Sequence, residues 1–105
     1  MKFNIKLLEG VWTKYNDEVE FLIRPFPNSK APFKMNGDLS IGEYNWTVFN
    51  ACVLDWRGIE DQEGTPLKCN TSTKQAIFDL DNKIHDFVVE KQKEIKEQRE
   101  LEIKN

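Results

Sequence analysis

The sequence is poor in the side chains that most often bind metals or act as nucleophiles: it has one histidine, His85, and two cysteines, Cys52 and Cys69. A zinc site needs about four ligands, and the two cysteines lie too far apart for the close pairs of zinc motifs. Phosphate-binding glycine loops, Gly-x-Ser-x-Gly and His-Glu-x-x-His are also absent. We therefore expect no catalytic residues, no cofactor and no metal.

His85 is the one residue that leaves an alternative open, because Asp86 follows it and Asp79 and Asp81 are near in the sequence. A histidine beside a carboxylate can act as a general base. We favour a histidine at the surface or at the boundary of the core, without a catalytic role.

Long hydrophobic runs are missing as well. No apolar stretch approaches the ~20 residues that cross a bilayer, and residues 1–6 show neither a hydrophobic signal core nor a small-residue cleavage site. These absences predict no membrane partner and a protein that stays in the cytoplasm where it is made. Both cysteines are then expected to be free thiols.

An excess of positive charge is lacking too. Fifteen Lys and Arg residues face eighteen Asp and Glu residues, and the formal net charge is −3. Nucleic-acid binding draws much of its affinity from a basic stripe that neutralises phosphates. The sequence therefore predicts no nucleic-acid partner.

Aromatic residues are plentiful, with seven Phe and three Trp among 105 residues, and 105 residues suffice for a single small domain. Residues 1–24 read as strands: 3–8 alternate apolar and polar side chains, and 11–15 and 19–24 are rich in β-branched and aromatic residues. We predict an antiparallel β-hairpin or a three-strand meander here. The proline-rich stretch 25–39 is predicted to be a connector.

Residues 40–105 are predicted to be mostly helical, with a polar loop at 58–70. Ser40 and Glu43 have the spacing of a capping box, in which each side chain binds a backbone N–H at a helix start. Beyond them, apolar residues recur at helical intervals of three, four and three, namely Trp46, Phe49, Val53 and Trp56. The same stretch also fits a buried strand, and we favour a helix that Gly58 closes.

Two further helices are expected after the loop. Thr71 or Ser72 is predicted to cap the first, with Ser72 and Gln75 as a second possible capping box. Asp81 or Asn82 is predicted to cap a long, charged helix from Lys83 onward. The fold class is therefore α+β, with strands first and two to three helices after them.

The last helix has an apolar stripe that thins toward its end: Ile84, Phe87, Val88 and Ile95. We expect its final turns to project from the domain. Ile95, Leu101 and Ile103 would then be available to a protein partner or to a second copy of the chain. A solvated charged tail without a partner is the alternative.

Residues 53–71, Val-Leu-Asp-Trp-Arg-Gly-Ile-Glu-Asp-Gln-Glu-Gly-Thr-Pro-Leu-Lys-Cys-Asn-Thr, resemble a run in small proteins from the tail-gene regions of tailed bacteriophages and prophages. The shared features are Trp-x-Gly, an aspartate, a Gly-x-Pro turn and a threonine that opens a helix. Residues 21–25 and the charged C-terminal segment are similar too. The likeness covers most of the chain and is weakest in the stretch 25–39.

The resemblance implies a non-enzymatic tail-assembly factor, a chaperone or adaptor that binds a tail protein in the cytoplasm of the bacterial host. A structural component of the tail and a small regulatory or anti-host protein are the alternatives. Within the shared run, Trp56 either folds the loop against the core or belongs to a contact surface, because exposed tryptophans are enriched at interfaces.

Overall fold

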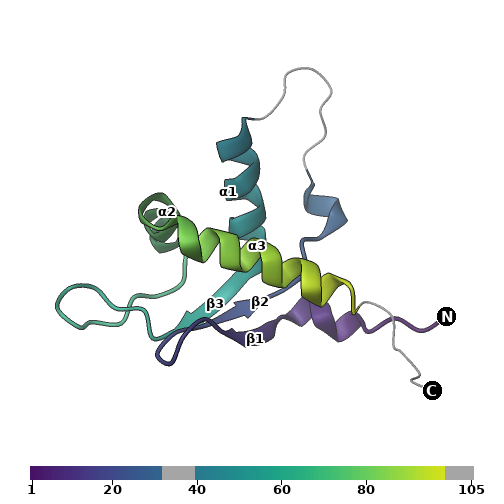
Figure 1. Ribbon diagram of the computed structural model, residues 1–105, viewed down its shortest axis with the longest axis horizontal. Coiled ribbons are helices and arrows are strands. Elements are labelled where there is room, and N and C mark those ends of the chain that lie inside the picture. The colour runs from purple at the N-terminus through teal and green to yellow at the C-terminus, as the bar shows by residue number, and fades with distance from the viewer. Residues whose placement is uncertain (32–39, 99–105) are drawn as a thin grey trace.

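The computed structural model describes residues 1–31 and 40–98 and has the predicted α+β architecture. Strands β1 (Val11–Lys14), β2 (Glu20–Ile23) and β3 (Val53–Arg57) form one antiparallel sheet in the order β1-β2-β3. Helix α3 (Asn82–Lys96) crosses one face of this sheet (Figure 1). Helices α1 (Ile41–Cys52) and α2 (Thr71–Leu80) pack against α3.

The prediction of a strand at residues 3–8 was wrong. Ile5–Glu9 form a 3₁₀ helix, in which the N–H of Leu7 donates to Asn4 O and that of Gly10 to Leu7 O. Phe3 and Ile5 are exposed, so these apolar side chains of the alternating pattern do not face the core. Only Leu7 is buried, and the tight helix directs it inward.

The stretch predicted to be one helix, residues 45–57, is half helix and half strand. Trp46 and Phe49 lie on α1, whereas Val53 and Trp56 lie on β3. A β-bulge explains the misleading spacing: Leu22 pairs with Asp55 and Ile23 with Val53, so Leu54 is an extra residue. The extra residue brings Val53 and Trp56, three positions apart, to the same buried face.

Gly58 follows this strand and ends no helix, contrary to the prediction. Its φ of 87° lies in the left-handed region that glycine adopts readily. A Cβ at this position would collide with the backbone oxygen of Glu18. Glycine is thus required because the turn between β1 and β2 passes directly over the end of β3.

Helix starts agree with the sequence in two of three cases. Ser40 and Glu43 form the predicted capping box, and Asp81 accepts from the N–H groups of Lys83 and Ile84 at the start of α3. Helix α2 begins one residue earlier than predicted. Asn70, not Thr71 or Ser72, is its cap, and the reciprocal partner is Thr73.

Helix α1 runs into β3 without a loop, so four successive carbonyls at the junction need partners. Lys74 Nζ donates to the carbonyls of Asn50 and Val53, at 2.9 Å each. The Nε of Arg24 donates to Ala51 O at 2.6 Å, and its backbone N–H donates to Cys52 O at 3.0 Å. Two cations from other parts of the chain thereby close the helix end.

The core lies between the sheet and the helices and is rich in aromatic rings. Phe21 is fully buried and makes edge-to-face contacts with Tyr15 and Trp56. The Nε1–H of Trp56 donates to Leu67 O at 2.8 Å, which satisfies the indole and ties the loop 58–70 to the sheet. The other buried apolar residues are Leu7, Ile23, Phe26, Val48, Phe49, Cys52, Val53, Ile84, Val88 and Ile95.

None of the helices described is long and apolar enough to cross a membrane.

The burial of Trp56 gives a first prediction. Trp56→Ala should lower the free energy of unfolding by about 3–5 kcal/mol, the usual cost of removing a buried aromatic ring. Trp12→Ala is the matched control, because Trp12 is only half buried, and it should cost clearly less. Denaturant unfolding of both variants measures the difference, and equal losses would contradict the assigned burial.

Ile95 gives a second prediction. Its side chain is 6% exposed, so Ile95→Ala should destabilise the fold by about 2–4 kcal/mol. Ile41→Ala removes the same atoms from a position that is 81% exposed and should change stability by less than about 0.5 kcal/mol. If the two variants melt alike, the last turn of α3 does not pack as described.

Candidate functional site

Trp56 and Ile95, two of the interaction residues predicted from the sequence, are each 6% exposed and belong to the core. For Trp56 this agrees with the first of the two readings, a side chain that folds the loop against the core. For Ile95 the expectation of an exposed apolar side chain was wrong. The reason is that α3 does not project over these turns. Its stripe continues through Gln92, a polar but buried residue. Leu101 and Ile103 lie outside the described residues.

His85 lies at the boundary of the core, one of the two positions expected for it. Its ring is 14% exposed, packs against Phe49 and Phe78, and has Nδ1 3.2 Å from Asp86 Oδ1. In the described part of the chain, neither Asp79 nor Asp81 forms a hydrogen bond or ion pair with His85. Nε2 is buried and has no partner within the described residues, so His85 presents no free ring nitrogen to the surface.

The two thiols are free and poorly suited to nucleophilic chemistry. Burial raises the pKa of Cys52 to about 12 and that of Cys69 to about 11. The attacking species in cysteine chemistry is the thiolate. Near neutral pH both side chains are therefore protonated, and Cys52 acts as a small apolar residue of the core.

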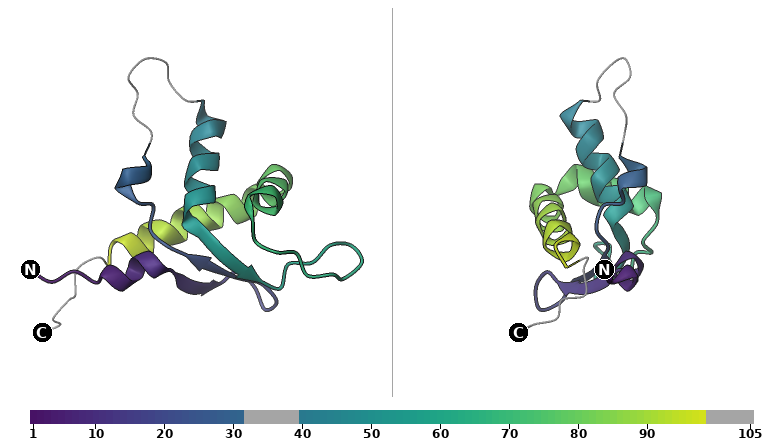
Figure 2. Two further views of the ribbon diagram at one scale, coloured as in Figure 1. Left: turned by 180° about the vertical axis from the view of Figure 1, so that it is seen from behind. Right: turned by 90° about the vertical axis from the view of Figure 1, so that its right-hand side faces the viewer.

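An apolar groove of about 250 Å³ lies beside the N-terminal 3₁₀ helix. Phe3, Ile5 and Leu8 form one wall and are 51%, 74% and 52% exposed. The other wall is the segment Pro25–Pro27, which is separated from β2 by Arg24 alone. Figures 1 and 2 both show this 3₁₀ helix beside the last turn of α3, and Lys96 closes that end of the groove.

The second wall is held firmly by α3. Gln92 Oε1 accepts the backbone N–H of Phe26 at 2.9 Å, in a buried hydrogen bond. Lys96 Nζ donates to Phe26 O and to Asn28 Oδ1, at 2.9 Å each. Both backbone polar groups of Phe26 are thus used within the fold, and the groove offers a preformed, largely apolar surface.

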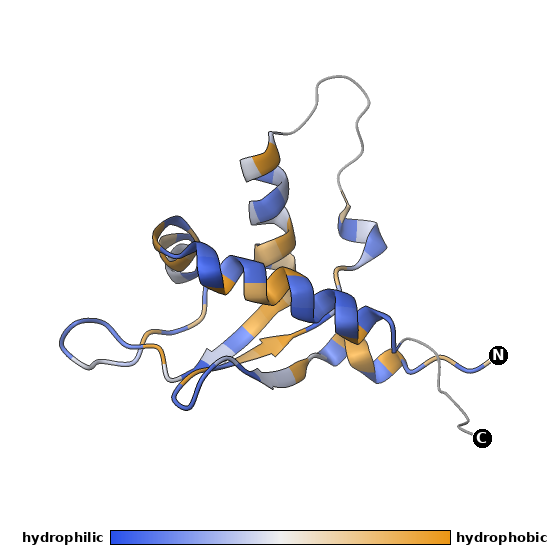
Figure 3. Cartoon of the chain, viewed as in Figure 1, coloured by the Kyte–Doolittle hydropathy of each residue, from blue (hydrophilic) through white to orange (hydrophobic). Residues whose placement is uncertain are grey.

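Sequence reasoning missed this groove because it assigned residues 3–8 to a strand and 25–39 to a connector. Two signals were present. Leu7 and Leu8 are adjacent, which breaks strand alternation and places one leucine inside and one outside. Pro-Phe-Pro at 25–27 is a stiff apolar segment. Figure 3 shows hydrophobic residues along the 3₁₀ helix and a largely hydrophilic outer side of α3.

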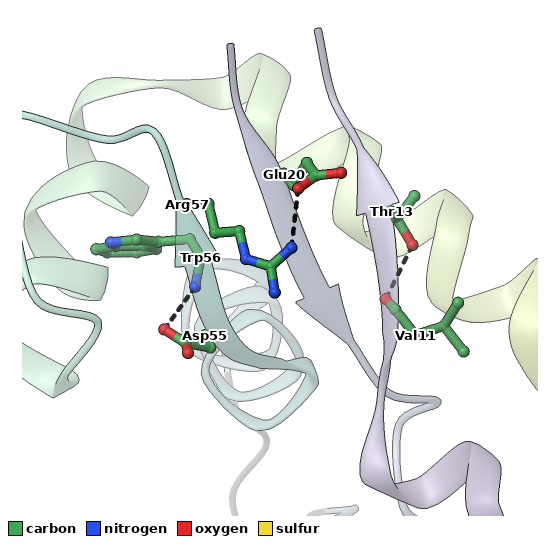
Figure 4. Close-up of polar contacts among 6 residues, drawn as sticks. All are labelled: Val11, Thr13, Glu20, Asp55, Trp56 and Arg57. Atoms are coloured by element: carbon green, nitrogen blue, oxygen red, sulfur yellow. Dashed lines mark hydrogen bonds and ion pairs between the residues drawn. The ribbon is translucent and has the colours of Figure 1, made fainter. Parts of the chain in front are cut away.

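The outer face of the sheet is a second exposed surface. The guanidinium of Arg57 stacks 3.7 Å from the centre of the Trp12 ring, and its Nη1 lies 3.2 Å from Glu20 Oε1. Figure 4 shows the Arg57 and Trp56 side chains leaving β3 in opposite directions. The charged and aromatic groups of this face are paired with one another, whereas the apolar walls of the groove are not.

Comparison of the chain with protein-family models, with curated proteins and with solved structures gives no significant match.

The thiol environments give a third prediction. Native protein at pH 8 should react with iodoacetamide far more slowly than a model thiol, because only a very small fraction of either cysteine is thiolate. In denaturant, without a reductant, both should alkylate fully, as mass spectrometry can count. A disulfide, or rapid labelling of the native chain, would contradict the assignment.

Proposed function

We propose that this chain is a non-enzymatic assembly factor of tailed bacteriophages or prophages, a chaperone or adaptor that binds a tail protein. The observation that carries the proposal is the apolar groove between Phe3, Ile5 and Leu8 and the segment Pro25–Pro27. A row of exposed apolar residues against a rigid wall is typical of a protein-binding surface.

The groove favours a polypeptide over a small-molecule ligand. Most of its lining is apolar, and Lys96, the one charged residue in the described part of the lining, already donates to Phe26 O and Asn28 Oδ1. The groove has room for one or two apolar side chains of an uncharged polypeptide segment.

The resemblance to tail-region proteins supports the choice of partner. In the structure the shared run builds the scaffold: Trp56 anchors the loop, Gly58 allows the close turn, and Asn70 starts α2. The run therefore stabilises the fold of this chain, and the groove, built from other residues, would select the partner. The proposed place of action is the cytoplasm of the bacterial host.

The groove gives a fourth prediction. The double variant Ile5→Ser and Leu8→Ser should weaken binding to the tail protein by at least about tenfold, the effect of losing a modest hot spot. Its thermal unfolding should match that of the unchanged chain, because both side chains are more than half exposed. Leu80→Ser is the matched control, since Leu80 is 84% exposed and does not line the groove.

Purified chain and the tail proteins encoded beside its gene serve as the binding partners, measured by calorimetry. In the phage, loss of the gene should give particles without complete tails, and the double variant should fail to restore them where Leu80→Ser succeeds. Mass spectrometry of purified particles separates a chaperone, which is absent, from a tail component, which is present. Normal tails without the gene would refute the proposal.

A further inference from the structure

A polar hollow of about 360 Å³ lies where α1, α2 and the segment after β2 meet. It does not share a residue with the apolar groove. Among the described residues, three cations and no carboxylate line it. The residues that matter are Arg24, Lys30, Lys74, Trp46, Asn50 and Thr71.

The positive charge here exceeds what the fold needs. Arg24 and Lys74 cap the carboxyl end of α1, and a helix end carries only about half a negative charge. Lys30 adds a third cation that takes no part in the cap. Within residues 1–31 and 40–98, none of the three forms an ion pair with a carboxylate.

Two further features increase the positive potential. Lys74 lies in the first turn of α2, where the helix dipole disfavours a cation, and Thr71, the first residue of that helix, also lines the hollow. Burial first, and then the charge of Arg24, lower the pKa of Lys74. An anion in the hollow would relieve this repulsion between cations.

Asn50 indicates what else a ligand should carry. Asn50 lines the hollow, and its Oδ1 is buried without a hydrogen-bond partner within the described residues. The terminal torsion of an asparagine turns easily, so a rotation of the amide toward the hollow would bring this oxygen to a ligand N–H. A ligand with both an anionic group and an N–H donor therefore fits better than an anion alone.

We infer that this hollow binds an acidic peptide segment, with a carboxylate against Arg24, Lys30 and Lys74 and a backbone N–H donating to Asn50. Nucleic acid fits less well, because it needs an extended basic stripe, and the chain carries a net charge of −3. The inference does not depend on the proposed function, since it uses different residues and a different ligand chemistry.

The test uses the full chain and a defined probe, the capped peptide acetyl-Asp-Glu-Asp-Glu-amide. Titration followed by ¹⁵N–¹H NMR should shift the Trp46 indole and Thr71 amide signals. The isosteric neutral peptide acetyl-Asn-Gln-Asn-Gln-amide should leave them in place. Inorganic phosphate, an anion without an N–H donor, should bind at least about fivefold more weakly than the acidic peptide.

Charge-reversed variants decide whether the hollow is the site. Lys30→Glu alters an exposed lining residue outside the α1 cap and should weaken peptide binding by about five- to tenfold. Lys83→Glu changes the net charge equally at an exposed position that does not line the hollow, and should leave the affinity unchanged.

Three results would overturn the inference. They are the absence of shifts with the acidic peptide at millimolar concentration, equal weakening by both variants, and equal affinity for phosphate. The first would mean that the hollow takes no peptide, the second that binding follows net charge alone, and the third that any small anion suffices.

Discussion

The closure of the carboxyl end of α1 is the interaction on which the rest of the architecture depends. A helix that becomes a strand within one residue has no turn to satisfy its last carbonyls, and buried carbonyls without partners cost about 1–3 kcal/mol each. Arg24 and Lys74 supply the donors from the end of β2 and from α2. The hydrogen bonds from Arg24 therefore hold β3 beside β2, and those from Lys74 hold α2 against α1.

The bulge in β3 determines which side chains of this strand reach the core. With Val53 and Trp56 on one face, the strand presents two apolar side chains to the helices, and Leu54 is left on the exposed side. Trp56 then reaches Phe21 in the sheet and the carbonyl of Leu67 in the loop. One extra residue in the strand thus joins sheet, loop and core.

The sequence predicted well wherever local chemistry decides the structure. Ser40 with Glu43, and Asp81, are side chains that bind nearby backbone N–H groups, so their role can be read from spacing. Prediction failed where distant partners decide. Residues 53–57 are a strand because β2 is available to pair with them. Residues 5–9 are no strand because their alternation faces no core.

The sequence did not predict the residues of the candidate groove. Of the four residues named for a protein contact, Trp56 and Ile95 are buried, and Leu101 and Ile103 lie outside the described residues. The groove lies between the N-terminal 3₁₀ helix and the segment Pro25–Pro27, which are about twenty residues apart. Its rigidity comes from α3, which holds the second segment. Gln92 illustrates the difficulty, because a glutamine on a helix stripe gives no sign that it will hold the backbone of Phe26.

The bond between Gln92 and Phe26 also sets an order of events during synthesis. Their sequence separation is 66 residues, and that between Lys96 and Phe26 is 70. Contacts so distant in sequence form slowly, because closing a long loop costs conformational entropy before the contact can stabilise the chain. On the ribosome, the wall Pro25–Pro27 cannot be fixed until α3 has left the exit tunnel. A chain in which α3 has not yet docked would therefore present loose apolar residues in place of a shaped groove.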